Sequence, residues 1–251
     1  MHSKIPAFIA LLFSLSASAQ SDGLEADRPG ESQSAQTVEK GNLQPELGLR
    51  RERSDDETVD YFEPRTTLRF GLLQGFELRA ELSPVTETHK GSASQSGLLP
   101  VELGFKASLW KGNGSLPEAA LLAQVGIPKL ASVAFRPTYA KPKVRLLLEN
   151  KITEALRLNY NLGAEWTGDD VKPQWLYTVS PELTLGKHWE AFAELYGFAQ
   201  KGSLPEHSFD AGLSYFIGKR AKADLSAGVG LTHSAPVNFV ALGFSIRFGK
   251  S

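Results

Sequence analysis

The chain has 251 residues, a formal net charge of −1 from 27 basic and 28 acidic side chains, and no cysteine. Its length allows one large domain or two small ones, and its balanced charge gives no indication of a nucleic-acid partner. Without cysteine, the sequence excludes disulfide bonds, thiolate metal sites and a catalytic thiol.

The first residues have the features of an export signal. MHSKIPAFIALLFSLSASAQ places the basic residue Lys4 before an apolar run, and the small residues Ala17 and Ala19 follow. This order predicts a secretory signal peptide at residues 1–19, cleaved before Gln20. No later run of about 18 apolar residues predicts a transmembrane helix. A soluble exported protein and a membrane barrel remain as alternatives.

The next segment, residues 20–42, is polar and rich in turn-forming residues. SDGLEADRPGESQSAQTVEKG has no hydrophobic periodicity and predicts an irregular or extended arm. The arm could fold into a barrel as a plug or remain a periplasmic tail, and composition alone favours the tail. As a plug, Asp27 and Arg28 would meet lumen charges of opposite sign, Pro29 would stiffen the turn, and Glu31 would lie beside them.

Alternation of apolar and polar residues begins near residue 43 and continues to the end of the chain. In RTTLRFGLL, Leu68, Phe70 and Leu72 share one face and Arg69 lies opposite. This period of two predicts β-strands, because successive side chains of a strand point to opposite sides. The same alternation recurs in about twelve segments, of which the clearest are EPRTTLRFGLL, FELRAELS, LLPVELGFKASLW, ALRLNYNLGAEW, SFDAGLSYFIG, KADLSAGVGLT and FVALGFSIRFG.

The connections between these segments alternate in length. Short ones, such as LQG near Gln74 and GK at 186–187, are followed by longer ones, such as 83–97 and 128–138. Short turns at one end and longer loops at the other are typical of the up-and-down meander of an outer-membrane barrel.

A soluble β-sandwich would also alternate, so the composition of the two faces has to decide between the folds. The polar face combines repeated glycines with Arg and Glu, which suits a curved wall around a crowded lumen. The apolar face is almost free of charge, as lipid contact requires, since a mid-membrane Arg or Lys costs ~2–4 kcal/mol. Aromatic residues near the segment ends predict interfacial girdles, although the first of them falls on the polar face: Trp110, Trp166, Trp175, Trp189 and Tyr177.

The two faces therefore favour an all-β fold: an up-and-down antiparallel transmembrane β-barrel of about 12 strands over residues 43–251, preceded by the irregular N-terminal arm. The last strand has an apolar face that ends in Phe248. Because an aromatic residue near the end of the last strand is what outer-membrane assembly machinery recognises in such barrels, we expect that machinery and outer-membrane lipid as partners. An ordinary closing strand is the alternative.

The arm and the first strand also resemble a known family. LEADRPGESQSAQTVEKGNLQPELG is similar to the mature N-terminus of bacterial outer-membrane proteins grouped under the MetA pathway of phenol degradation, at Asp27, Arg28, Pro29, Glu31, Ser32, Val38, Gly41, Gln44 and Glu46. LRFGLLQGFELR, YNLGAEW and FDAGLSY extend the resemblance over nearly the whole mature chain. Gly30 departs from the family, in which an acidic residue is more usual. The resemblance implies a barrel with a transport role and hydrophobic or aromatic compounds as its solutes.

The charged residues of the polar face are candidates for the lumen or for a gate within it. Both signs are well represented, so the pattern does not predict an ion-selective ring. The charges either fill the lumen as salt bridges that hold the wall, or border a hydrophilic path for a small solute. The candidates are Arg65, Arg69, Glu77, Arg79, Glu81, Arg157, Glu165, Glu194, Asp210 and Arg247, with Arg50, Glu102, Lys106, Lys143, Arg145 and Asp224 on the same face.

From these features we expect a channel or transporter for passive movement of small molecules, without cofactor or metal, in the outer membrane of a Gram-negative bacterium. A structural or surface-interaction barrel without transport is the first alternative, because loops such as 85–97 are long and polar. A lipid hydrolase at the barrel rim is the second. Its candidates, His207 beside Ser208 and His233 beside Ser234, are neighbours only in sequence, which does not align a base with its nucleophile.

Overall fold

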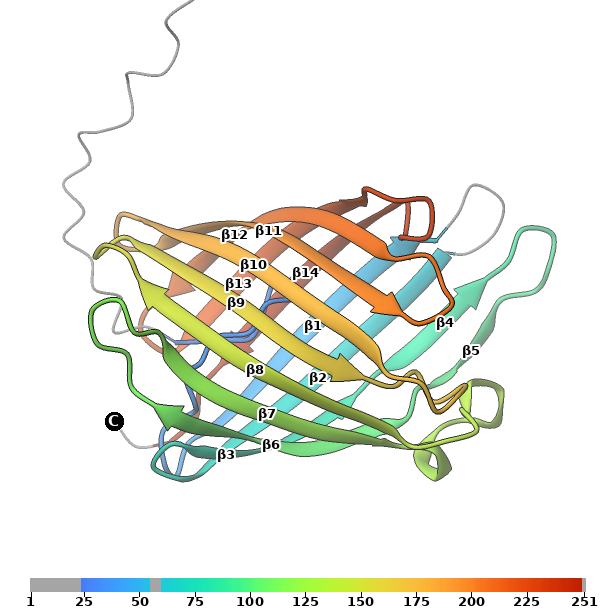
Figure 1. The fold of residues 1–251 in the computed structure, drawn as a ribbon, viewed down its shortest axis with the longest axis horizontal. Coiled ribbons are helices and arrows are strands. Elements are labelled where there is room, and N and C mark those ends of the chain that lie inside the picture. The colour runs from blue at the N-terminus through green and yellow to red at the C-terminus, as the bar shows by residue number, and fades with distance from the viewer. Residues whose placement is uncertain (1–23, 55–59, 250–251) are drawn as a thin grey trace, which may run out of the picture.

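The computed structural model describes residues 24–54 and 60–249, so the predicted signal peptide lies outside the described residues. The described chain consists mainly of β-strands (Figure 1). None of its described helices has the length and apolar character needed to cross a membrane. The strands are β1 (Leu43–Arg53), β2 (Asp60–Leu73), β3 (Phe76–Leu82), β4 (Pro84–Thr88), β5 (Gln95–Leu98), β6 (Val101–Trp110), β7 (Glu118–Ile127), β8 (Lys141–Lys151), β9 (Leu156–Glu165), β10 (Gln174–Leu185), β11 (Trp189–Gln200), β12 (Glu206–Ile217), β13 (Ala221–Gly230) and β14 (Asn238–Ile246).

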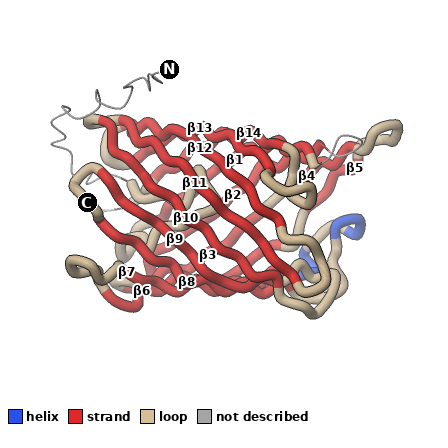
Figure 2. Tube along the Cα trace, turned by 45° about the horizontal axis from the view of Figure 1, so that its top comes forward, coloured by secondary structure: helices blue, strands red, loops and turns tan. Residues whose placement is uncertain are grey.

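Twelve of these strands close into one antiparallel barrel (Figure 2). β1 pairs with β2 on one side and with β14 on the other, and at this seam Glu46 lies opposite both Thr67 and Ser245. The other strands of the barrel pair in chain order, which is the up-and-down order, except that β3 pairs with β6 because β4 and β5 lie outside this series. A closed barrel satisfies its backbone hydrogen bonds internally, as a membrane-spanning sheet requires. The prediction of an all-β barrel with about twelve strands is confirmed.

β4 and β5 form a hairpin that extends beyond the wall of the barrel (Figure 1). β4 pairs with the first residues of β2, whereas β5 pairs only with β4. Hydroxyl groups join the two strands, Thr86 with Ser96 at 2.8 Å and Thr88 with Ser94 at 2.9 Å. The sequence predicted a loop over residues 83–97, because side chains rich in Ser and Thr give this hairpin no apolar face.

The alternation divides the wall into an apolar outer face and a largely polar inner face. On β14, Val240 and Leu242 are 53% and 52% exposed, whereas the intervening Ala241 is 4% exposed. On β2, Phe70 is exposed and the neighbouring Arg69 is completely buried. Apolar side chains thus cover the outside, where lipid would lie, and most charged side chains of the strands point into the lumen.

The two ends of the barrel differ in their connections. At the end that we call the short-turn end, tight turns contain glycines with positive φ, such as Gly75 at 74° and Gly186 at 71°. At the opposite, long-loop end, the connection after β7 contains the 3-10 helices η1 (Pro128–Leu130) and η2 (Val133–Phe135). This loop borders the β5 edge, because Leu98 and Ser132 exchange hydrogen bonds of 2.9 and 3.0 Å.

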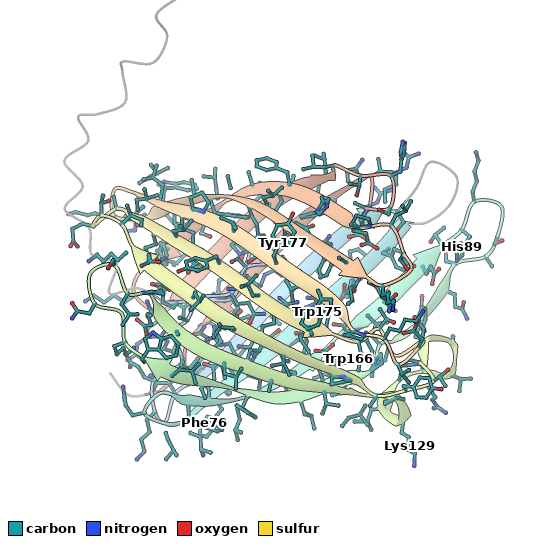
Figure 3. The ribbon with its side chains drawn as sticks, viewed as in Figure 1. Phe76, His89, Lys129, Trp166, Trp175 and Tyr177 are labelled. Atoms are coloured by element: carbon teal, nitrogen blue, oxygen red, sulfur yellow. The ribbon has the colours of Figure 1, made fainter. Side chains whose placement is uncertain are left out.

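The aromatic residues near the strand ends do not all occupy girdle positions. Trp175 and Trp189 are exposed on the outer face, and Tyr177 shares the outer face with Trp175 (Figure 3). Trp110 is also exposed, since a bulge in β6 between Ser108 and Trp110 shifts the alternation by one residue. The prediction for Trp166 is wrong: this residue follows β9 and lines a cavity of the lumen.

Candidate functional site

The N-terminal arm, residues 24–42, lies inside the barrel (Figures 1 and 2). Leu24, Ala35 and Val38 are almost completely buried there, and Ala35 clusters with Leu122 and Leu147 of the wall. The arm is therefore held partly by apolar contacts with inward-facing side chains of β7 and β8.

Side chains of the wall bind peptide groups of the arm. The backbone N–H of Gln33 donates to Asn161 Oδ1 at 2.7 Å, and Asn161 Nδ2 donates back to the Gln33 carbonyl at 2.9 Å. The Val38 N–H donates to Glu77 at 2.6 Å, and Lys106 Nζ donates to the Ser34 carbonyl at 3.1 Å. Buried peptide groups need such partners, so these contacts fix the path of the arm.

Asp27 lies at the centre of a buried cluster of charges. Its carboxylate accepts hydrogen bonds from Arg79 Nη1 at 2.6 Å and from Lys106 Nζ at 2.8 and 3.0 Å, and Arg69 Nη1 lies 3.5 Å away. The other carboxylates of the cluster are Glu46 and Glu77, each bonded to Arg69 at 2.8 Å. Burial opposes the ionisation of Asp27, but the three cations outweigh it and hold the pKa of this carboxyl well below its usual range.

The tip of the arm contacts two separate strands of the wall, β8 and β11. Arg145 Nη2 donates to Glu31 Oε1 at 2.6 Å. The backbone N–H groups of Glu31 and Ser32 donate to Glu194 at 2.7 and 2.6 Å. A Cβ atom at Gly30 would lie 2.7 Å from Glu194 Oε2, so the glycine found here permits the close approach. These bonds place the tip across the lumen.

Further ion pairs hold the arm on the N-terminal side of its tip. Arg28 Nη2 binds Asp224 Oδ1 at 3.1 Å, and Lys222 Nζ donates to the Arg28 carbonyl at 3.0 Å. Glu25 pairs with Arg157, which also binds two carboxylates of the wall. Burial raises the pKa of Glu25, but the charge of Arg157 prevails and lowers it below its usual value.

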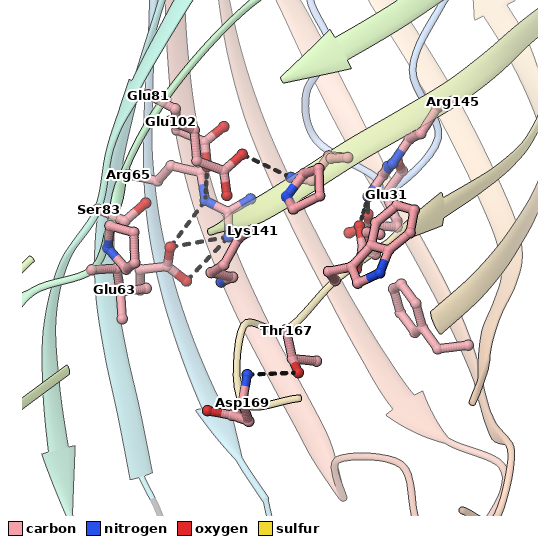
Figure 4. Close-up of a pocket in the computed structure, with 17 residues that line it drawn as sticks. Glu31, Glu63, Arg65, Glu81, Ser83, Glu102, Lys141, Arg145, Thr167 and Asp169 are labelled. Carbon is pink, nitrogen blue, oxygen red and sulfur yellow. Dashed lines mark hydrogen bonds and ion pairs between the residues drawn. The ribbon is translucent and has the colours of Figure 1, made fainter. Parts of the chain in front are cut away.

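Three cavities lined by described residues follow one another through the lumen. The largest of these three, about 370 Å³, lies toward the long-loop end and is drawn in Figure 4. A second of about 70 Å³ lies beneath the arm tip, and a third of about 10 Å³ lies toward the short-turn end. Glu31 lines the first two, and Arg28 lines the second and third. Since a single water needs about 10–15 Å³ of such space, the third cavity holds about one water, and the described spaces become too small for a solute toward the short-turn end.

Most of the predicted wall residues fall into two groups in the structure. Those that contact the arm directly are Arg69, Glu77, Arg79, Arg157 and Glu194. Those that line the largest cavity are Arg65, Glu81 and Glu165. Asp210 lies opposite Glu194 on the neighbouring strand, and Arg247 Nε donates to Gln44 at 3.0 Å. Of the predicted arm residues, Asp27, Arg28 and Glu31 bind the wall, and Pro29 follows a cis peptide bond and lines the smallest cavity.

The charge pattern of the sequence indicates charged groups of the lumen but not its uncharged and aromatic groups. Thr178 Oγ1 lies 2.8 Å from Ser32 Oγ of the arm. Tyr196 and Phe239 are buried on the inner face, where the Arg50 guanidinium lies 3.7 Å from the Phe239 ring centroid. The signal was present in β11, whose inward positions are either acidic or aromatic (Glu190, Phe192, Glu194, Tyr196 and Phe198).

The candidate His and Ser residues near the long-loop rim do not pair with each other as the base and nucleophile of a hydrolase would. His207 Nδ1 lies 3.0 Å from the Tyr177 hydroxyl, and Ser234 Oγ donates to the Pro205 carbonyl at 2.7 Å. No Ser–His hydrogen bond is found among the described residues, and no group of three or more His, Asp or Glu in that part of the chain is arranged to hold a metal.

Known proteins of similar fold are outer-membrane channels and porins. An outer-membrane channel from Pseudomonas putida F1 matches with a TM-score of 0.69 and 11% identity, over 88% of this chain and 99% of that chain. The KdgM porin matches with 0.54 and 15% identity over 81% and 99%, and the NanC porin with 0.57 and 10% over 81% and 98%. At such identities the similarity establishes the fold alone, and no curated protein matches in sequence.

A family model is more specific than these structural similarities. It is described as "Putative MetA-pathway of phenol degradation" and matches residues 26–248, which include both the arm and the wall of the barrel. Because the match covers most of the chain, the protein belongs to this family.

Proposed function

We propose that the protein is an outer-membrane channel through which small molecules move passively, and that its N-terminal arm controls the passage. The observation that carries this proposal is the arm itself, which lies across the lumen of a sealed barrel and separates a cavity of about 370 Å³ from one of about 70 Å³. A barrel with only a structural role would need no large cavity at one end.

The lengths of the connections indicate how the barrel is oriented in the outer membrane. Outer-membrane barrels have short turns on the periplasmic side and longer loops outside. We therefore place the largest cavity at the extracellular entrance and the arm on the periplasmic side. In the described conformation the arm closes the path, so transport requires that its tip leave the wall.

Small aromatic compounds are the solutes that we propose. The description of the family names phenol degradation. The largest cavity is also lined by the apolar side chains of Leu99, Trp166 and Phe198 among its charged ones. Such a surface can hold a ring while polar groups orient it.

Swelling of liposomes that contain the purified protein tests the channel. We expect slow entry of small solutes through the full-length protein, and faster entry when residues 24–38 are deleted, because the deletion joins the three cavities. If neither protein raised permeability above that of empty liposomes, the barrel would have the structural or surface-interaction role instead, and the channel proposal would fail.

A further inference from the structure

The middle cavity, of about 70 Å³, has buried donors that the surrounding groups leave unpaired. Arg28, Arg79 and Arg145 all line it, and the buried Nε–H group of each has no hydrogen-bond partner among the described residues. A buried donor without a partner is costly, more so when it is charged. The same lining has one unpaired buried acceptor, Gln33 Oε1, so its unpaired donors outnumber its unpaired acceptors and the cavity fits an oxygen-rich anion.

The largest cavity, directly above, adds a further cation. Lys141 lines it (Figure 4), and its Nζ makes no ion pair or hydrogen bond with any residue that the structure describes. Several carboxylates of the same cavity are already paired with cations at 3.0 Å, namely in Arg65–Glu63, Lys143–Glu102 and Arg145–Glu165. The largest cavity nevertheless has more acidic than basic side chains in its lining, whereas basic side chains outnumber acidic ones in the middle cavity, so the excess of positive charge lies in the middle cavity.

Glu31 shows how this site holds a carboxylate. Its side chain lines both cavities and accepts the 2.6 Å hydrogen bond from Arg145, whose own side chain is only 4% exposed. Charge-assisted bonds from a buried guanidinium are among the stronger ones in proteins. A solute carboxylate that reached Arg145 would compete with Glu31 for the same donors.

We propose that the lumen binds small carboxylates that carry an apolar, ring-sized body. The carboxylate lies against Arg145 and the unpaired Nε–H groups of the middle cavity, and the body lies in the larger cavity against Trp166 and Phe198. By taking the place of the Glu31 side chain, the solute releases the arm tip from Arg145. The inference rests on the proposed channel function, because it assigns a solute class and a trigger to the same passage.

Binding to the full-length protein in detergent micelles tests the inference without any permeation step. We choose benzoate as the probe, with benzamide and benzylamine as its neutral and cationic counterparts, and measure affinity by titration calorimetry. Benzoate is expected to bind, and both counterparts at least tenfold more weakly.

Two substitutions are expected to act in opposite directions. Glu31→Gln removes the competing carboxylate and should tighten benzoate binding about tenfold, whereas Arg145→Gln should weaken it about tenfold or more. Arg145→Lys, which keeps the charge but loses the guanidinium geometry, should fall between wild type and Arg145→Gln. Lys172→Gln removes an exposed cation at the same end of the barrel and should change nothing.

Equal affinity for benzoate and benzamide would overturn the inference, as would a change of the same sign in Glu31→Gln and Arg145→Gln. Inorganic phosphate that binds as tightly as benzoate would reveal a site for inorganic anions and would also overturn it. The channel proposal is tested separately. Permeation without benzoate binding would refute only the solute class, whereas benzoate binding without permeation would refute only the channel.

Discussion

Replacing Asp27 by Asn should release the arm from the lumen. The substitution keeps the shape of the side chain but removes one negative charge from a cluster in which three cations (Arg69, Arg79 and Lys106) face three carboxylates (Asp27, Glu46 and Glu77). The wall then retains three buried cations beside two carboxylates. The amide group of Asn is also a hydrogen-bond donor, and it would face the N–H groups of the three cations, which are donors as well.

The magnitude follows from the burial of the cluster. Removing one partner of a buried ion pair costs about 3–5 kcal/mol, because the other charge is left uncompensated. When the arm leaves the lumen, water enters and solvates the uncompensated cation, which recovers part of this free energy. The substitution therefore shifts the equilibrium toward the released arm. A change of about 3 kcal/mol raises the released fraction by roughly a hundredfold, since every 1.4 kcal/mol is a factor of ten.

Reaction of a single thiol measures the released fraction directly. The chain has no cysteine, so Ser34→Cys, at a buried position of the arm, introduces the only one. We expect a water-soluble maleimide to label it roughly a hundredfold faster in the Asp27→Asn background. Glu39→Gln, the same charge change at an exposed position of the arm, is the matched control. Equal labelling rates in the Asp27→Asn and Glu39→Gln proteins would refute the reasoning.

Three further predictions concern the arm and the wall. The neighbours of Asp27 lower the pKa of its carboxyl group, so the ionised carboxylate holds the arm at every pH above its unperturbed pKa of about 3.9 and is lost only in stronger acid. The labelling rate of Ser34→Cys, corrected for thiol ionisation, should therefore stay constant from about pH 5 to 8. A Cβ at Gly71 would lie 2.1 Å from the Glu39 carbonyl oxygen, so Gly71→Ala should speed labelling without any change of charge, and an unchanged rate would contradict the described path. Leu242→Arg, on the outer face, should lower the free energy of unfolding in lipid by ~2–4 kcal/mol in a urea titration, whereas Leu204→Arg, in an exposed loop, should leave it nearly unchanged.

The barrel could be predicted from the sequence because its strands repeat one simple rule. In β14, Val240, Leu242 and Phe244 alternate with Ala241 and Gly243, and the absence of charge from the apolar face favours its contact with lipid. The β4–β5 hairpin was missed because it projects beyond the wall and has no apolar face to bury. Trp110 was placed on the wrong face because a bulge shifts the alternation, and periodicity alone does not locate a bulge.

The site could be predicted only in part. Alternation assigns Arg69 and Glu77 to the lumen, but it does not say that both meet the arm, because that contact depends on how a segment without periodicity folds. The likeness of the arm to a known family favoured a plug, whereas its polar composition favoured a tail. The structure resolves this through groups such as Asn161 and Thr178, uncharged side chains whose hydrogen bonds with Gln33 and Ser32 no pattern of charge could indicate.

A reversible crosslink between the arm and the wall tests the central claim most directly. Ser32 Oγ and Thr178 Oγ1 lie 2.8 Å apart, so Ser32→Cys with Thr178→Cys places two thiols within reach of a disulfide. In liposomes, oxidation of this double variant should abolish solute entry and reduction should restore it, while each single variant should respond to neither. Solute entry that continues at the same rate through the fully crosslinked protein would show that molecules pass without movement of the arm.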